Sequence, residues 1–221
     1  MMPSVEQQEL VRQAARALAG AELVHAYGHC SLRLDAGHFL VCAALPMGSI
    51  TGEPGSVVAL DEPLPEGVLG EVRIHREIYR RRAAAGGICR IMPPALMALS
   101  TQGIVPRARH GIGAYFAELP LWDDPRLLRD DQAAERLAER AGDAPAIVMR
   151  GNGAVTIGAS LEQAVTLAWF LEDAARVERD VRAMGFDPAS GVLDADEVVA
   201  RQVWAGGVTE RMWRHLTDSA T

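Results

Sequence analysis

The fold is decided by residues 87–94, which read Gly-Ile-Cys-Arg-Ile-Met-Pro-Pro. Residues 88–92 are apolar apart from Arg90, and this pattern predicts a short buried strand. The two prolines end the strand because proline has no backbone N–H for a sheet ladder, so a helix is predicted at 95–99. Side chains at a strand end beside a helix start are well placed to face a ligand.

Helices and strands alternate on both sides of this segment. A helix is predicted at 5–19, where Ser4 supplies an N-cap and apolar residues recur at helical spacing. The other predicted helices are 71–82, 130–141, 160–184 and 194–203, and the other predicted strands are 30–34, 38–42, 57–60, 119–124, 146–149 and 154–157. The rest of the C-terminal segment, with Trp204 and Trp213, is predicted to be a loose end. This alternation predicts an α/β domain in three layers.

Composition restricts the possible functions. The 221 residues are 49% hydrophobic, which suits one domain with a sizeable core. A net charge of −7 argues against a nucleic-acid partner. All 22 basic residues are arginine, so the chain offers no lysine for a Schiff base or a P-loop.

The cysteines and the hydropathy pattern indicate a cytoplasmic protein. Cys30, Cys42 and Cys89 form no C-x-x-C pair and are odd in number, which suits a reducing compartment. The first ten residues lack the basic and apolar regions of a signal peptide. No apolar run approaches the roughly 18 residues that a membrane helix needs, so no membrane partner is expected.

Six motifs occur in an order and at a spacing typical of one family. They are the first helix, GHCSLR in a hairpin, EVRIHREIY in a helix, GGICRIMPP in the strand, MRGNGAVTIG in a second hairpin and SLEQA at the start of the long helix. In these motifs the sequence resembles the class II aldolase/adducin family over about residues 5–184. The resemblance implies a three-layer α/β/α domain with a central, mostly antiparallel sheet. We assign it residues 1–187, followed by a helical tail at 188–221 that packs on the same domain or on a neighbouring subunit.

The same resemblance implies a metal site that this chain has lost. Metal-dependent members carry a His-x-His pair on the strand and a third histidine in the later hairpin, which together bind a divalent cation, usually zinc. Here the matching positions hold Arg90, Met92 and Asn152, while the glutamate of the preceding helix matches Glu71. Guanidinium has no lone pair to offer a metal, and a thioether is too soft for zinc or magnesium. We therefore expect no metal and no other cofactor.

Arg90 is the centre of the predicted site. Our hypothesis is that its charge replaces the cation and binds a carboxylate or a developing oxyanion. The alternative is that Arg90 only forms a buried ion pair with Glu71. The candidate catalytic residues are Glu71, Arg90, His29 and His110, since a carboxylate or an imidazole can move a proton. The candidate substrate-binding residues are Asn152, Ser31, His75, Tyr115 and Met92.

The expected substrate is a small carboxylate without a phosphate. Sugar-phosphate aldolases of the family bind phosphate with Ser, Thr and Gly residues, whereas the matching positions here read Ala-Ala-Leu-Pro at 43–46 and Leu-Gly at 69–70. At position 29 the sequence is similar to the decarboxylase branch of the family, which has histidine where the aldolases have asparagine; here the residue is His29. We therefore expect a metal-independent lyase that catalyses decarboxylation, carbon–carbon cleavage or isomerisation through an enolate.

Two alternatives stay open. The first is a non-catalytic binding protein of the adducin type. The second is a lyase with a rebuilt site in which His29, His75 and His110 bind zinc or another divalent cation. Family members are commonly homotetramers with active sites between subunits, so a homotetramer is expected, and Tyr115, Trp204 and Trp213 are candidates to close the pocket.

Overall fold

The central sheet is mixed and mostly antiparallel. The computed structural model describes residues 2–218 and places its strands in the order β3-β2-β1-β4-β7-β6-β5. They are β1 (His29–Arg33), β2 (His38–Val41), β3 (Ser56–Ala59), β4 (Gly87–Ile91), β5 (Leu121–Trp122), β6 (Ala146–Met149) and β7 (Ala154–Gly158). Adjacent strands are antiparallel except β5 and β6, which are parallel. The strand predicted around Arg90 is therefore β4, in the middle of the sheet.

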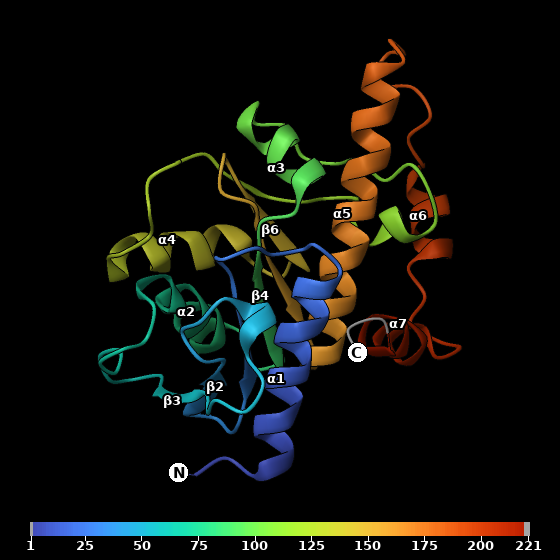
Figure 1. Ribbon diagram of the computed structural model, residues 1–221. Coiled ribbons are helices and arrows are strands. Elements are labelled where there is room, and N and C mark those ends of the chain that lie inside the picture. Colours follow the sequence, from blue (N-terminus) through green and yellow to red (C-terminus); the bar gives the residue numbers. More distant parts are fainter. Residues whose placement is uncertain (1, 219–221) are drawn as a thin grey trace.

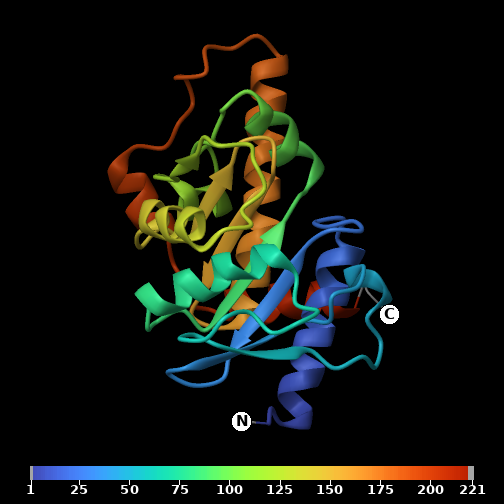
Figure 2. The same ribbon diagram turned by 90° about the vertical axis from the view of Figure 1, so that its left-hand side faces the viewer.

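Helices cover both faces of the sheet (Figures 1 and 2). On one face α1 (Val5–Gly20) and α5 (Leu161–Ala183) pack on β1, β4 and β7, and on the other α2 (Arg73–Arg81) packs on α4 (Asp131–Ala141). Short 3₁₀ turns occur at Met47–Ser49, Gly70–Val72 and Ile112–Phe116. The predicted three-layer α/β/α fold with a mostly antiparallel sheet is confirmed. Within residues 2–218, no helix has the length and apolar composition needed to cross a membrane.

The register between β1 and β4 fixes the centre of the molecule. His29 lies opposite Arg90, and Cys30 lies opposite Cys89. Because successive side chains of a strand alternate between faces, His29 and Arg90 share one face and the two cysteines share the other. Close approach of the chain just before β1 requires glycine at position 28, where φ is +141° and a Cβ atom would lie 2.6 Å from Val24 Cγ1.

The C-terminal segment corrects one prediction. The tail contains α6 (Ala195–Arg201) and α7 (Val208–Asp218), so the prediction of a loose end after residue 203 is wrong. In α7 the apolar residues Val208, Met212, Trp213 and Leu216 recur at helical spacing and pack on the core. Helix α7 lies against α1 and α5 of the same chain, as Figure 1 shows. The domain boundary at residue 187 stays a prediction.

Helix α3 (Pro94–Thr101) begins without a side-chain cap of its own. Glu172 of α5, whose side chain is buried, accepts hydrogen bonds from the backbone N–H groups of Ala95 and Leu96, each at 3.0 Å. A carboxylate is favourable there because it satisfies two free N–H groups and lies at the positive end of the helix. This contact ties the segment that follows β4 to the long helix.

We therefore expect Glu172→Ala to lower the free energy of unfolding by about 1–3 kcal/mol, because two buried N–H groups lose their acceptor. Urea denaturation monitored by circular dichroism measures this change. Glu139→Ala, at an exposed position of α4, is the matched control and should stay within about 0.5 kcal/mol of the wild type. Equal effects of the two substitutions would contradict a capping role for Glu172.

Candidate active site

A cavity of about 570 Å³ opens where the central strands end. His29 at the start of β1 and Arg90 near the end of β4 line it, together with Asn152 in the turn between β6 and β7. Glu71 reaches the cavity from the 3₁₀ turn that precedes α2. Four polar residues that are far apart in sequence thus meet at one place.

The polar floor is built by β-strand pairing and by a close backbone approach at one glycine. The antiparallel register places His29 beside Arg90. Gly153, with φ of +71°, lets the turn that carries Asn152 approach the backbone of Ile91, because any Cβ atom at residue 153 would collide with the Ile91 carbonyl. Asn152 Nδ2 lies 3.4 Å from Glu71 Oε1, and this contact connects the β6–β7 turn to Glu71.

Arg90 is the largest fully buried side chain in the described part of the protein, with 2% of its surface exposed. Its Nη1 donates to the carbonyl of Ile91 at 2.8 Å, and its Nη2 lies 3.6 Å from Glu71 Oε2. Burial lowers the pKa of Arg90, an effect opposed by the Glu71 carboxylate, yet a guanidinium stays charged at physiological pH. The buried Nε has no hydrogen-bond partner among the described residues. The site therefore contains a cation with unused donor capacity.

His29 lies next to this cation and is itself buried. Burial, and secondarily the charge of Arg90, lowers the pKa of His29 to about 3. Its Nδ1 lies 2.9 Å from Nε2 of His75, whose pKa burial also lowers well below its usual range. Both imidazoles are therefore neutral at physiological pH.

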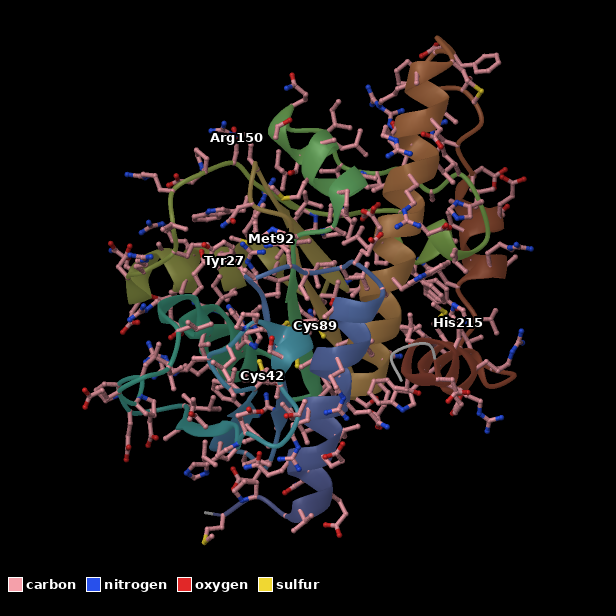
Figure 3. All side chains as sticks on the ribbon, viewed as in Figure 1. Tyr27, Cys42, Cys89, Met92, Arg150 and His215 are labelled. Carbon is pink, nitrogen blue, oxygen red and sulfur yellow. The ribbon has the colours of Figure 1, made fainter. Side chains whose placement is uncertain are left out.

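The mouth of the cavity is mostly apolar. Four exposed side chains surround it, namely Tyr27, Leu45, Leu69 and Leu127. Arg129 adds an exposed guanidinium, which makes no side-chain hydrogen bond or ion pair within the described residues. Figure 3 labels Tyr27 and Met92, which both line the cavity. No sequence pattern marks Tyr27 or Arg129, since both lie in irregular loops without a motif.

Not every predicted site residue lies at the cavity. The structure brings Glu71, Arg90, His29, Asn152 and Met92 together around it. Ser31 and His75 are fully buried and contact each other behind His29, so neither lines the cavity of this chain.

His110 and Tyr115 lie elsewhere in the subunit. His110 Nε2 contacts Asp173 Oδ2 at 2.8 Å, and the Tyr115 hydroxyl donates to the carbonyl of Val203 at 2.6 Å. The Tyr115 ring also packs on Trp204, with ring centroids 4.6 Å apart. Tyr115 therefore helps to hold the C-terminal tail against the domain. For His110 or Tyr115 to serve the cavity, each must come from another copy of the chain. Their catalytic and substrate-binding roles stay predictions.

The residues at the position where the family resemblance implies a metal ion do not fit a divalent cation. Arg90 can only donate hydrogen bonds there, and Met92 and Asn152 offer a soft sulfur and a neutral amide. Within residues 2–218, no group of three His, Cys, Asp or Glu side chains is arranged to hold a metal ion. The two histidines that do meet, His29 and His75, use one ring nitrogen each to contact one another.

Comparisons with known proteins agree with the resemblance seen in the sequence. Residues 9–178 match the family model described as the class II aldolase and adducin N-terminal domain. A 3,4-dihydroxyphthalate decarboxylase from a Terrabacter species is 26% identical over 95% of both chains.

Two solved structures are similar as well. The L-fuculose-1-phosphate aldolase from Thermus thermophilus is 28% identical, with a TM-score of 0.74 over 84% of this chain and all of that one. The L-fuculose 1-phosphate aldolase from Glaciozyma antarctica is 18% identical, with a TM-score of 0.81 over all of this chain and 92% of that one. The second likeness concerns the fold alone.

The buried neutral histidines predict how stability depends on pH. Between the ordinary histidine pKa of 6.5 and the value of about 3 for folded His29, the unfolded chain binds a proton that the folded chain does not. Stability should therefore fall as the pH drops below about 6.5, by up to about 1.4 kcal/mol per pH unit for each such histidine.

Urea midpoints measured at several pH values between 7 and about 4 test this expectation. His29→Gln should flatten the acid-side slope relative to the wild type. His25→Gln, at an exposed position, is the control and should leave the slope unchanged. A His29→Gln slope identical to that of the wild type would show that His29 is not held neutral.

Proposed function

The chain belongs to the class II aldolase and adducin family, and on that premise we propose that it is a metal-independent lyase that decarboxylates a small, unphosphorylated aromatic carboxylate. The observation that carries this proposal is the buried Arg90 guanidinium, which lines the cavity and has an Nε without a protein partner. A fixed positive charge in a water-poor site stabilises negative charge far more strongly than the same charge does in water.

Decarboxylation breaks the bond between the ring carbon and the carboxylate, and the electron pair stays on the ring carbon. CO₂ leaves, and a proton must replace it. Arg90 would stabilise the negative charge that develops on a conjugated substrate oxygen, and Asn152 would add a neutral hydrogen bond. Glu71, which is partly exposed to the cavity, would deliver a proton taken up from solvent. No metal takes part in these steps.

The lining of the cavity favours an unphosphorylated aromatic substrate. Ala44, Leu45, Pro46, Leu69 and Gly70 line it, and none of these side chains offers a hydroxyl to a phosphate. The apolar mouth suits a flat ring, since aromatic ligands gain most of their binding energy from buried apolar area. The similar decarboxylases act on 3,4-dihydroxyphthalate, which is such a ring. Among the reactions that the family resemblance allows, decarboxylation therefore has the strongest support.

Arg129 supports a substrate with a second anionic group. Its guanidinium is exposed at the mouth of the cavity, whereas Arg90 is buried at the floor. One cation at each end suits a dianion such as an aromatic dicarboxylate better than a monoanion.

The expected homotetramer remains a proposal, and light scattering of the purified protein measures it.

We expect Arg90→Met to lower kcat for 3,4-dihydroxyphthalate by at least about 100-fold, because the charge is lost while most of the side-chain volume is kept. CO₂ release measures the rate, and circular dichroism checks that the variant is folded. The control is Arg150→Gln, which should retain wild-type turnover. Arg150 lies in the β6–β7 turn and pairs with Asp123. Figure 3 shows Arg150 at the outer end of this turn.

The same assay separates the alternatives. Treatment of the wild type with a chelator should leave the rate unchanged. A rate that falls with the chelator and returns with zinc would contradict the metal-independent mechanism and favour a rebuilt histidine site. Binding of aromatic carboxylates without release of CO₂ from any of them would contradict the decarboxylase and favour a binding protein.

For Arg129→Gln we expect KM for an aromatic dicarboxylate to rise about fivefold with little change in kcat, because an exposed charge contributes up to about 1 kcal/mol. The KM for the corresponding monocarboxylate should change less than the KM for the dicarboxylate. An equal increase for both substrates would mean that Arg129 does not contact a second anionic group.

A further inference from the structure

A line of four buried polar side chains leads away from the cavity. His29 Nδ1 lies 2.9 Å from His75 Nε2, and His75 Nδ1 lies 2.7 Å from Ser31 Oγ. Ser31 Oγ lies 3.0 Å from the Tyr79 hydroxyl, which in turn donates to the Ser31 carbonyl at 3.1 Å. All four residues are at most 3% exposed. Of the four, His29 alone lines the cavity.

The far end of this line fixes the direction of every hydrogen bond in it. A backbone carbonyl can only accept, so the single proton of the Tyr79 hydroxyl is used on the Ser31 carbonyl. Burial raises the pKa of Tyr79, so the phenol keeps this proton. The contact between the two hydroxyls then requires Ser31 to donate to Tyr79.

The same reasoning passes along the line to the cavity. Because the Ser31 proton is used on Tyr79, Ser31 Oγ must accept from Nδ1–H of His75. A neutral imidazole carries one proton, so Nε2 of His75 is an acceptor and takes the proton of His29 Nδ1. Four protons thus satisfy four contacts, and Nε2 of His29 is left with a lone pair.

The opposite direction satisfies fewer contacts. If Ser31 donated to His75, the protons of both imidazoles would shift toward the cavity and Nε2 of His29 would carry one. The contact between Ser31 Oγ and Tyr79 would then compete with the Ser31 carbonyl for one phenol proton. In a buried network, an unsatisfied contact costs more than it would in water.

We propose that Tyr79, Ser31 and His75 are positioning residues that hold His29 in the tautomer protonated at Nδ1, so that its Nε2 accepts a hydrogen bond from a hydroxyl of the substrate. His29 Nε2 is buried and has no hydrogen-bond partner within the described residues. His29 lies opposite Arg90 in the sheet and both residues line the cavity, so an acceptor and a cation belong to neighbouring residues of the cavity floor. This pair is matched by a ligand with a hydroxyl donor adjacent to a carboxylate or other anionic oxygen.

The inference about the substrate rests on the proposed function, whereas the tautomer does not. The position of the proton is a property of the protein alone and can be measured without turnover. If the protein proved not to be a decarboxylase, the NMR result for His29 would still stand. If His29 were protonated at Nε2 instead, the expected loss of rate in Arg90→Met would still stand. The two proposals can therefore fail separately.

Nitrogen NMR of protein labelled with ¹⁵N-histidine tests the tautomer, with the His29 signals assigned by their absence in His29→Gln. We expect Nδ1 of His29 to have the shift of a protonated nitrogen and Nε2 that of an unprotonated nitrogen throughout the neutral pH range. A proton on Nε2 in the wild type would overturn the proposal.

Two substitutions test the positioning residues. Tyr79→Phe removes the terminal hydroxyl but keeps the ring, which packs on Phe39 and under the Arg33 guanidinium. Ser31→Ala interrupts the line in the middle. In both variants the His29 signals should shift toward protonation at Nε2. Ser100→Ala, at an equally buried serine of α3 outside the line, is the matched control and should leave them unchanged.

Kinetics supply a second readout. With a hydroxylated aromatic carboxylate, Tyr79→Phe should lower kcat/KM by about tenfold. It should lower kcat/KM much less for the methyl ether of the same compound, which has no proton to donate. Wild-type tautomer signals in both variants, or equal losses on the two substrates, would show that Tyr79 and Ser31 have only a structural role.

Discussion

The architecture of the site depends on the burial of one charge. The Arg90 guanidinium lies in the central strand of the sheet, and removing such a charge from water is costly unless partners compensate for it. Glu71 and the carbonyl of Ile91 compensate only in part, because the ion pair is 3.6 Å long and Nε has no protein partner. The same charge helps to keep the neighbouring His29 neutral. The cavity floor therefore carries one buried cation, which Glu71 compensates only in part and which acts together with burial on His29.

We propose that this family scaffold carries an arginine where metal-dependent members carry a metal ion. The β-sheet, the turn before α2 and the β6–β7 turn converge on the position where the family resemblance implies a metal ion. At that position the chain has Arg90, Met92 and Asn152, which do not fit a divalent cation. Function depends on the site rather than on the fold, so the similarity to the L-fuculose-1-phosphate aldolases does not determine the reaction. The apolar mouth and the lack of hydroxyl side chains at 44–46 and 69–70 support our proposal of an unphosphorylated ring.

Local sequence patterns predicted most of the fold and the polar floor of the site. The proline pair after β4 and the cap at Ser4 set element boundaries that the structure reproduces closely. The motif match placed Glu71, Arg90, His29 and Asn152 in one site because strand pairing fixes His29 beside Arg90, and the turns next to α2 and β7 bring the other two residues to them. Tyr27 and Arg129 could not be found in this way, since they lie in loops whose path depends on tertiary packing. The proposed positioning role of Tyr79 could not be predicted either. Helical periodicity marks Tyr79 as a core residue and does not show where its hydroxyl points. Helix α7 was missed although its apolar spacing was present in the sequence.

The most direct test of the central claim is a crystal structure of the protein grown with added zinc and soaked with phthalate, an aromatic dicarboxylate. The replacement of the metal by Arg90 predicts one carboxylate within hydrogen-bond distance of the Arg90 guanidinium, with no cation between ligand and protein. A zinc ion that bridges the ligand to Glu71 or His29 would contradict it.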